Sequence, residues 1–207
     1  MKHIFLSTFL FLFLNNLFSQ SFMHGAGLTI TVGVPSTYEN IKTSFGVGII
    51  YSPRINLYEK QNLSLSLGIP LSIGFSGGAS FNPTSNVSSD ENTSFMLNAP
   101  LIVNLNLGSG ATKDTKKRIG FFIGGGYGFY NASFTSKNSS TALPTGGYVL
   151  PSQNQTNNYT IVGPVENIGM RFGVGKQYRN IETKFSLMQG TYDFKSVIYG
   201  LATLFNF

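Results

Sequence analysis

Histidines are the first residues to consider, because a histidine beside a serine or a carboxylate is the usual general base of hydrolases and acyltransferases. The chain has two, His3 and His24, and no cysteine. His3 lies in a segment that we expect to be removed, and His24 falls at the start of the first predicted strand, where we interpret it as a solvated rim residue. These residues make neither a catalytic pair nor a set of metal ligands. We therefore expect no enzyme activity, no cofactor and no metal.

A second group of candidates is charged. Glu166, Arg171, Glu182 and Lys184 lie close together in the C-terminal part of the chain, and their formal charges cancel. We predict that all four point into the interior of the fold and form a charge network, because a buried charge without a partner is costly. The alternative is a path for protons or ions, since ionisable groups inside membrane proteins often mark such paths.

A third group lies in the long polar segment 131–158. The segment is rich in Asn, Ser, Thr and Gln but also contains five large apolar residues, namely Phe134, Leu143, Tyr148, Val149 and Leu150. Exposed apolar side chains often mark a contact with a partner. An equal alternative is that they extend the two neighbouring strands beyond the membrane.

The elements that position these residues are strands. From Leu63 to Phe75, large apolar residues occupy every odd position, and small or polar residues occupy every even one. Alternation of this kind puts one face of a strand in an apolar environment. Thirteen residues are also enough for a transmembrane strand, which needs about 9 to 11.

Seven other segments show a similar alternation between turn-forming stretches. The eight segments are 27–34, 45–51, 63–75, 95–107, 119–129, 167–174, 181–187 and 197–207. An even number of strands can close into a barrel, which removes the unpaired edges that lipid does not tolerate. We predict an all-β fold, an eight-stranded antiparallel up-and-down transmembrane β-barrel, with ten strands as the main miscount.

The compartment follows from the N-terminus. Lys2 and His3 precede an apolar run at 4–14 and a short polar stretch at 15–20. This order is typical of a secretory signal peptide, and the apolar run is too short for a helical membrane anchor. We expect a cleaved signal peptide at 1–20 and one barrel domain at 21–207.

Composition supports a lipid-facing surface. Only 11% of the residues are charged, whereas soluble domains have about 25%. Outer-membrane lipid is therefore the expected partner of the outer face. A soluble secreted β-sandwich with its apolar faces inward is the alternative.

The connections differ between the two ends. Two long polar ones, 77–93 and 131–158, fall on the side opposite the termini, while the turns on the side of the termini carry most of the positive charge, including Arg54 and Lys116–Arg118. Short periplasmic turns and long external loops are usual in outer-membrane barrels. We expect both termini in the periplasm and a basic rim that binds anionic lipid or a periplasmic protein. No nucleic-acid partner is expected.

The last residues carry a further signal. Phe205 and Phe207 end the chain in the outward-facing register of the last strand, and they resemble the membrane-insertion signal read by the outer-membrane assembly machinery. Ala202 stands where that signal usually has glycine. Together with the stretch Pro53–Lys60, the signal peptide and the strand pattern, this ending resembles the small outer-membrane β-barrel proteins of the Bacteroidota type, the PorT-like or porin-like group. The resemblance implies a fold and a location, and hardly any specific activity.

The sequence thus predicts an integral outer-membrane protein without enzymatic activity, acting as a structural or interaction protein through its external loops. The PorT-like resemblance suggests an accessory of a larger outer-membrane or secretion assembly, with another membrane or periplasmic protein as partner. A narrow channel for ions or small solutes is the first alternative, because charged groups are predicted inside the barrel. A lipid-modifying outer-membrane enzyme is the second, and the histidine count speaks against it.

Overall fold

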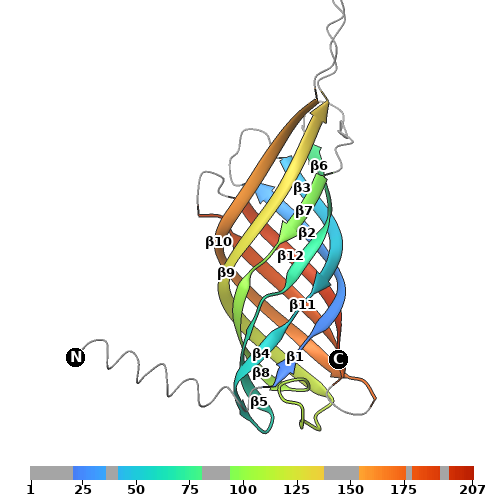
Figure 1. Ribbon diagram of the computed structural model, residues 1–207, viewed down its shortest axis with the longest axis vertical. Coiled ribbons are helices and arrows are strands. Elements are labelled where there is room, and N and C mark those ends of the chain that lie inside the picture. The colour runs from blue at the N-terminus through green and yellow to red at the C-terminus, as the bar shows by residue number, and fades with distance from the viewer. Residues whose placement is uncertain (1–20, 36–41, 81–93, 138–153, 176–178, 192–195) are drawn as a thin grey trace, which may run out of the picture.

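The computed structural model describes residues 21–35, 42–80, 94–137, 154–175, 179–191 and 196–207. These residues form a closed antiparallel β-barrel with tilted strands (Figure 1). The strand segments, in chain order, are β1 (Phe22–Met23), β2 (Gly25–Pro35), β3 (Lys42–Tyr51), β4 (Arg54–Lys60), β5 (Leu63–Gly68), β6 (Leu71–Ser80), β7 (Ser94–Asn98), β8 (Leu101–Gly108), β9 (Ile119–Lys137), β10 (Asn154–Gly173), β11 (Asn180–Gln189) and β12 (Ser196–Asn206).

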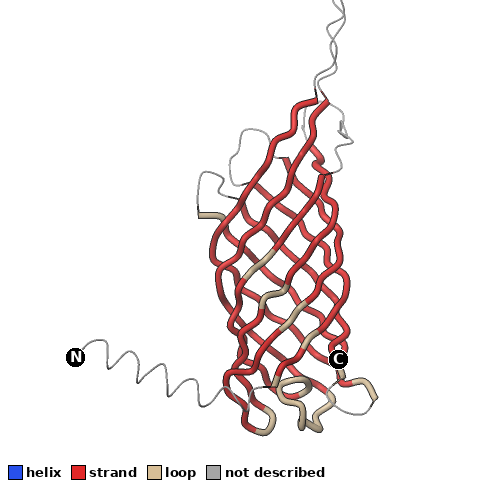
Figure 2. Tube along the Cα trace, viewed as in Figure 1, coloured by secondary structure: helices blue, strands red, loops and turns tan. Residues whose placement is uncertain are grey.

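Eight continuous strands result, because four pairs of segments are single strands with a short interruption. The pairs are β1 with β2, β3 with β4, β5 with β6, and β7 with β8. Three of the interruptions contain a proline, Pro53, Pro70 or Pro100, which has no N–H to donate to the ladder. The loop-coloured stretches within the barrel wall in Figure 2 mark these places.

The barrel closes where the last strand meets the first. β12 pairs with β2 from Ser196↔Pro35 to Asn206↔Gly25, and every other neighbouring pair is antiparallel as well. The prediction of an eight-stranded antiparallel barrel is therefore confirmed. Among the described residues no helix has the length and the apolar character needed to cross a membrane.

The two faces of the wall have opposite character. Large apolar side chains are exposed around the outside, among them Leu28, Ile49, Phe75, Ile123 and Ile168, whose exposed fractions run from 56% to 67%. Small, polar and a few large apolar side chains are buried inside the barrel, in the lumen. The predicted alternation is confirmed, with the apolar face outward as lipid requires.

The two ends of the barrel also differ. Phe207 N donates to His24 O, so the beginning of β2 and the end of β12 lie side by side. We call this end of the barrel the terminal end. The other end is named the hairpin end, because β9 and β10 rise there above the remaining strands (Figure 1). They pair with each other from Ile119↔Phe172 to Lys137↔Asn154.

Three strands are much longer than the sequence pattern indicated. β9 runs to Lys137 rather than ending near residue 129, and β10 begins at Asn154 rather than near residue 167. The second strand continues through β4 to Lys60, so that Gln61 and Asn62 form the turn. These differences have one cause: polar residues can continue a strand where a neighbouring strand supplies hydrogen bonds, and a search for alternating apolar residues does not detect such extensions. The predicted signal peptide, residues 1–20, lies outside the described residues.

Candidate functional site in the barrel lumen

A buried charge cluster lies in the lumen near the terminal end, and Glu182 is its centre. Glu182 Oε2 accepts hydrogen bonds from Arg171 Nε at 2.7 Å and from Arg54 Nη1 at 3.2 Å, and both contacts are ion pairs. Asn206 Nδ2 donates to the same oxygen at 3.1 Å. One carboxylate therefore holds together the strands β4, β10, β11 and β12.

Arg171 is the most extensively contacted cation. Its side chain is 2% exposed, its Nη1 donates to Asn106 Oδ1 at 2.8 Å, and its guanidinium lies 4.2 Å from the centre of the Phe122 ring. A guanidinium suits this place because it is planar and offers several donors in fixed directions. These contacts fix Arg171 across the lumen between β8, β9 and β11.

Lys184 is the third buried cation. It is 6% exposed, as is Arg54, and lies two residues from Glu182 on the inward face of β11. With Arg54, Arg171 and Lys184 against Glu182, the cluster carries three positive charges and one negative charge. The sequence analysis predicted a buried network whose formal charges cancel. The buried cluster instead has an excess of positive charge, so this prediction is wrong.

The turn between β8 and β9 covers the terminal end of the lumen. Ser109, Ala111 and Thr112 of this turn are buried. Gly110 O accepts from Arg54 Nη2 at 3.1 Å, and Ala111 O accepts from Asn56 Nδ2 at 2.9 Å. The turn, residues 109–112, is a plug that is tied to the charge cluster, and we refer to it as the plug turn.

Glycine at 110 is required for this plug. Its φ is +68°, and a Cβ there would lie 2.5 Å from Asn180 Nδ2 and 3.0 Å from Arg171 Cδ. A residue with a side chain would be strained and would displace the groups it meets.

Farther toward the hairpin end the lumen contains a cluster of apolar side chains beside the buried hydroxyls of Thr31 and Ser76. Eight buried side chains form one cluster there: Met96, Ile102, Tyr130, Ala132, Ile161, Val165, Met188 and Ile198. Polar and apolar side chains both occupy the interior, and the lumen of an eight-stranded barrel is about wide enough for side chains alone.

Of the four predicted network residues, three are inside and one is not. Arg171, Glu182 and Lys184 are buried, whereas Glu166 is exposed on the outer face of β10. The prediction for Glu166 is wrong because β10 pairs with β11 without a bulge from Val165 to Gly173. Residues 166 and 168 thus share a face, and Ile168 points outward.

Arg54 is the site residue that the sequence analysis missed, since it was assigned to a turn. Its neighbour Ile55 is 41% exposed, while Arg54 and Asn56 are buried. Alternation of polar and apolar residues at 54–57 is the signal that would have found it. Continuation of the strand past Pro53 is what turns this residue inward.

The candidate contacts on the long loop fall mostly outside the described residues. Leu143, Tyr148, Val149 and Leu150 are among the undescribed residues. Phe134 belongs to β9, and its backbone pairs with Asn157 of β10. Phe134 therefore lies on a strand, and its role as a partner contact stays a prediction.

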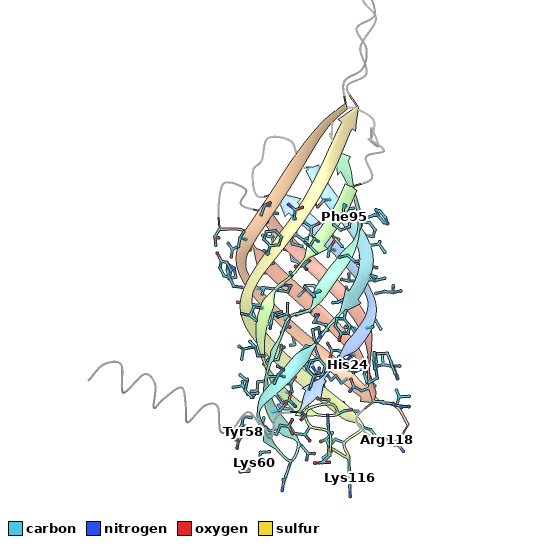
Figure 3. The ribbon with its side chains drawn as sticks, viewed as in Figure 1. His24, Tyr58, Lys60, Phe95, Lys116 and Arg118 are labelled. Atoms are coloured by element: carbon cyan, nitrogen blue, oxygen red, sulfur yellow. The ribbon has the colours of Figure 1, made fainter. Side chains whose placement is uncertain are left out.

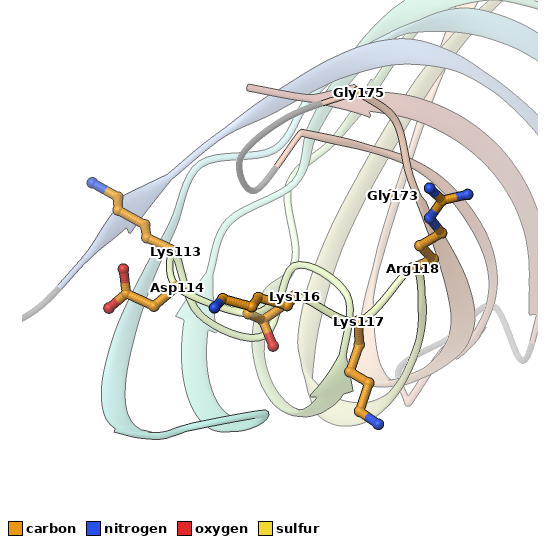
Figure 4. A pocket seen from close by; sticks show the side chains of 8 residues that line it. Lys113, Asp114, Lys116, Lys117, Arg118, Gly173 and Gly175 are labelled. Atoms are coloured by element: carbon orange, nitrogen blue, oxygen red, sulfur yellow. The ribbon is translucent and has the colours of Figure 1, made fainter.

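The rim at the terminal end is basic (Figure 3). A pocket of about 410 Å³ lies between the β8–β9 connection and the end of β10. It is lined by Lys113, Asp114, Thr115, Lys116, Lys117, Arg118, Gly173 and Gly175. Figure 4 shows the cationic side chains spread around it rather than directed at one point. This arrangement suits a diffuse anionic surface better than a single small anion.

The aromatic residues at the C-terminus lie on the outer face. Phe205 and Phe207 are 42% and 40% exposed, and their rings stack at 6.2 Å. His24 lies 4.3 Å from the Phe207 ring, and its Nδ1 is 3.2 Å from the Tyr51 hydroxyl. His24 is therefore part of an aromatic group at the rim, with no serine or carboxylate among the contacts found for it.

Comparison with solved structures identifies the fold. Neisserial surface protein A superimposes with a TM-score of 0.54 at 10% identity, covering 91% of this chain and 97% of that protein. The attachment invasion locus protein Ail of Yersinia pestis superimposes with a TM-score of 0.51 at 11% identity, covering 91% and 98%. The fold is that of a small outer-membrane β-barrel.

A second structure of Ail, in complex with the heparin analogue sucrose octasulfate, matches with a TM-score of 0.50 at 10% identity, again over 91% of this chain and 98% of that one. No family model and no curated protein matches this sequence. The barrel fold and the apolar outer face together indicate an integral outer-membrane location. The specific resemblance to the PorT-like group stays a prediction.

Proposed function

We propose that this protein is a non-enzymatic outer-membrane barrel that binds a partner at the cell surface through the hairpin formed by β9 and β10. The observation that carries the proposal is the length of these two strands. β9 has 19 residues and β10 has 20. The pairing of β9 with β7 stops at Ala132, and that of β10 with β11 stops at Val165.

Above these points the two strands form a ribbon, which we define as residues 133–137 and 154–158. Within the ribbon, β9 and β10 pair only with each other. An isolated pair of strands is marginally stable in water, so the ribbon gives little stability to the barrel. Polar residues dominate it, including Ser133, Thr135, Gln155 and Asn157. Amide and hydroxyl groups suit hydrogen bonding to a polar, uncharged partner surface.

The filled lumen supports a binding role over conduction. An open water path would have to cross both the plug turn and the apolar cluster. The structure of Ail with a heparin analogue illustrates that a barrel of this fold takes part in binding an external ligand. In that role this protein serves as an accessory or recognition component of a larger outer-membrane or secretion assembly.

The proposed orientation places the terminal end in the periplasm. Three supports are the short turn at Gln61–Asn62, the basic rim of Figure 4 and the long connections at the hairpin end. Short turns on the periplasmic side are usual for such barrels. The basic rim then faces the anionic headgroups of the inner leaflet or a periplasmic protein.

A clean deletion tests the proposal. Ala132 and Tyr159 are paired across the ladder, so residues 133–158 can be replaced by Asn-Gly, which favours a tight two-residue hairpin turn. The parent and the shortened protein are purified from native outer membranes in mild detergent, and the proteins that remain bound are identified by mass spectrometry. We expect partners that are present with the parent and absent with the shortened protein.

A second variant keeps the length of the ribbon and replaces only two of its polar residues, Thr135 and Asn157, with alanine. Weaker binding of the same partner is expected from this variant. Identical partners in all samples would contradict the proposal. Conductance of the parent protein in liposomes would favour the channel instead.

A further inference from the structure

Glu166 lies on the lipid-facing belt of β10, one residue from Val165, where pairing with β11 ends. On β10, Ile168, Met170 and Phe172 follow it toward the terminal end, and all three are exposed. Six residues of a tilted strand correspond to roughly 15 Å of height. The side chain of glutamate is too short to reach water on that side.

The belt also continues above Glu166. Its partner on β9 is Gly125, which is followed toward the hairpin end by the outward residues Tyr127 and Phe129, 51% and 38% exposed. Toward the terminal end Gly125 follows Ile123, which is 59% exposed. The carboxylate thus has apolar outward side chains toward the terminal end and aromatic ones toward the hairpin end, where the Tyr127 hydroxyl lies 3.4 Å from Thr191 Oγ1.

Gly125 leaves a notch beside this carboxylate. A Cβ built on Gly125 would find only one backbone atom nearby, Val165 O at 3.7 Å. The other ladder partner of Glu166 is Leu187 on β11. The outer wall at this height is therefore a glutamate next to an open space, framed by apolar side chains.

The described part of the barrel offers no counter-charge to this carboxylate. Among the described residues, Glu166 has no ion pair. The exposed cations of that part of the chain all belong to the terminal end: Lys60, Lys113, Lys116, Lys117, Arg118 and Arg179. Lipid tails offer no cation either. A charged group in hydrocarbon is costly and marks a functional position by default.

A second copy of the chain does not supply the missing cation. In two parallel barrels in one membrane, residues of equal height meet, and the described part of this chain has no outward lysine or arginine at the height of Glu166. The partner that fits is a different membrane protein with such a residue.

We propose that Glu166 and Gly125 form a lateral docking site within the membrane for another membrane-embedded protein, which inserts a lysine or arginine side chain from its own lipid-facing surface. The cation enters the notch over Gly125 and pairs with the Glu166 carboxylate. Loss of one member of a desolvated charge pair is strongly unfavourable, so this contact makes the association dependent on charge. The site is distinct from the β9–β10 ribbon and stands independently of it.

Photo-crosslinking in native outer membranes tests the site. A photoreactive benzoylphenylalanine replaces Ile168, the next outward residue on β10 and 56% exposed, in the full chain, with Glu166 unchanged or replaced as Glu166→Gln, so that Gly125 and its notch stay intact. A matched probe at Ile49 on β3 examines another part of the belt, where the outward residue is 58% exposed. Peptide mapping then locates the attachment point on any captured protein.

We expect the probe at 168 to capture one membrane protein next to a lysine or arginine, with no such product from the probe at 49. The yield should fall at least about tenfold with Glu166→Gln. Exchange of charges, Glu166→Lys combined with glutamate in place of the partner's cation, should restore it. The Glu166→Gln barrel should remain folded to the same extent, as seen by its migration in unheated gels.

Three results would overturn the proposal. The first is a yield that does not depend on Glu166. The second is capture of lipid only, which would mean that the glutamate faces the bilayer. The third is capture of a second copy of this chain.

Discussion

Replacement of Glu182 by glutamine tests the closed lumen most directly. The variant keeps the size of the side chain but removes the only negative charge of the cluster. Arg54 and Arg171, which now contact one oxygen at 3.2 Å and 2.7 Å, would be left with Lys184 as three buried cations without a counter-charge.

The expected loss of stability is large. Breaking a buried ion pair by removal of one partner costs about 3 to 5 kcal/mol, and total stabilities of proteins are typically about 5 to 15 kcal/mol. With a denaturant dependence of about 2 kcal/mol per molar urea, the unfolding midpoint should fall by about 2 M.

The assay is urea unfolding of the refolded barrel in lipid vesicles, followed by tyrosine fluorescence, since the chain has 10 tyrosines and no tryptophan, and by migration in unheated gels. The double variant with Arg171→Met and Glu182→Gln serves as the matched comparison. It should be more stable than Glu182→Gln alone, because one uncompensated cation is removed with the carboxylate.

A small effect would refute this reasoning. If Glu182→Gln lowers the midpoint by less than about 0.5 M, corresponding to about 1 kcal/mol, water in the lumen must already screen the cluster. The interior would then be hydrated, and the channel alternative would gain support.

Three further predictions concern other parts of the barrel. Gly110→Ala should lower stability by about 1 to 2 kcal/mol through its left-handed φ alone, and liposome conductance should rise because the plug turn is displaced; unchanged conductance would mean that the apolar layer closes the lumen by itself. Ile49→Lys, on the lipid-facing surface away from Glu166, should cost about 2 to 4 kcal/mol in vesicle unfolding, against about 0 to 1 kcal/mol for Ile119→Lys near the terminal end; equal costs would contradict the assigned membrane belt. Phe207→Ala should reduce the amount of folded protein in outer membranes severalfold while leaving refolding into vesicles unchanged, measured by unheated gels, and a loss of both would assign Phe207 a purely structural role.

Alternation of residue type was sufficient to predict the barrel. A thirteen-residue run such as Leu63–Phe75 identifies its own lipid face, because outward residues must be apolar wherever the wall meets hydrocarbon. The inward positions of Arg171 and Lys184 follow from the same parity. Local patterns were less reliable at Pro53, where an apparent turn is the continuation of a strand.

The members of the site could not be paired from sequence. Arg54 and Glu182 are 128 residues apart, and only the registers of the intervening strands bring them together. The plug turn is likewise inconspicuous in sequence, since its buried residues are small and polar, and its role depends on carbonyl groups that every residue has.

The sequence by itself determined the number of strands, the lipid-facing surface and the direction of most side chains, because these depend on a period of two that lipid enforces at each position. Tertiary structure alone decided which charged side chains contact one another, how the terminal end is closed and which side chains surround Glu166 on the outer face. Those properties depend on strand register and continuity around a closed barrel, and a shift of one residue would exchange the inside for the outside.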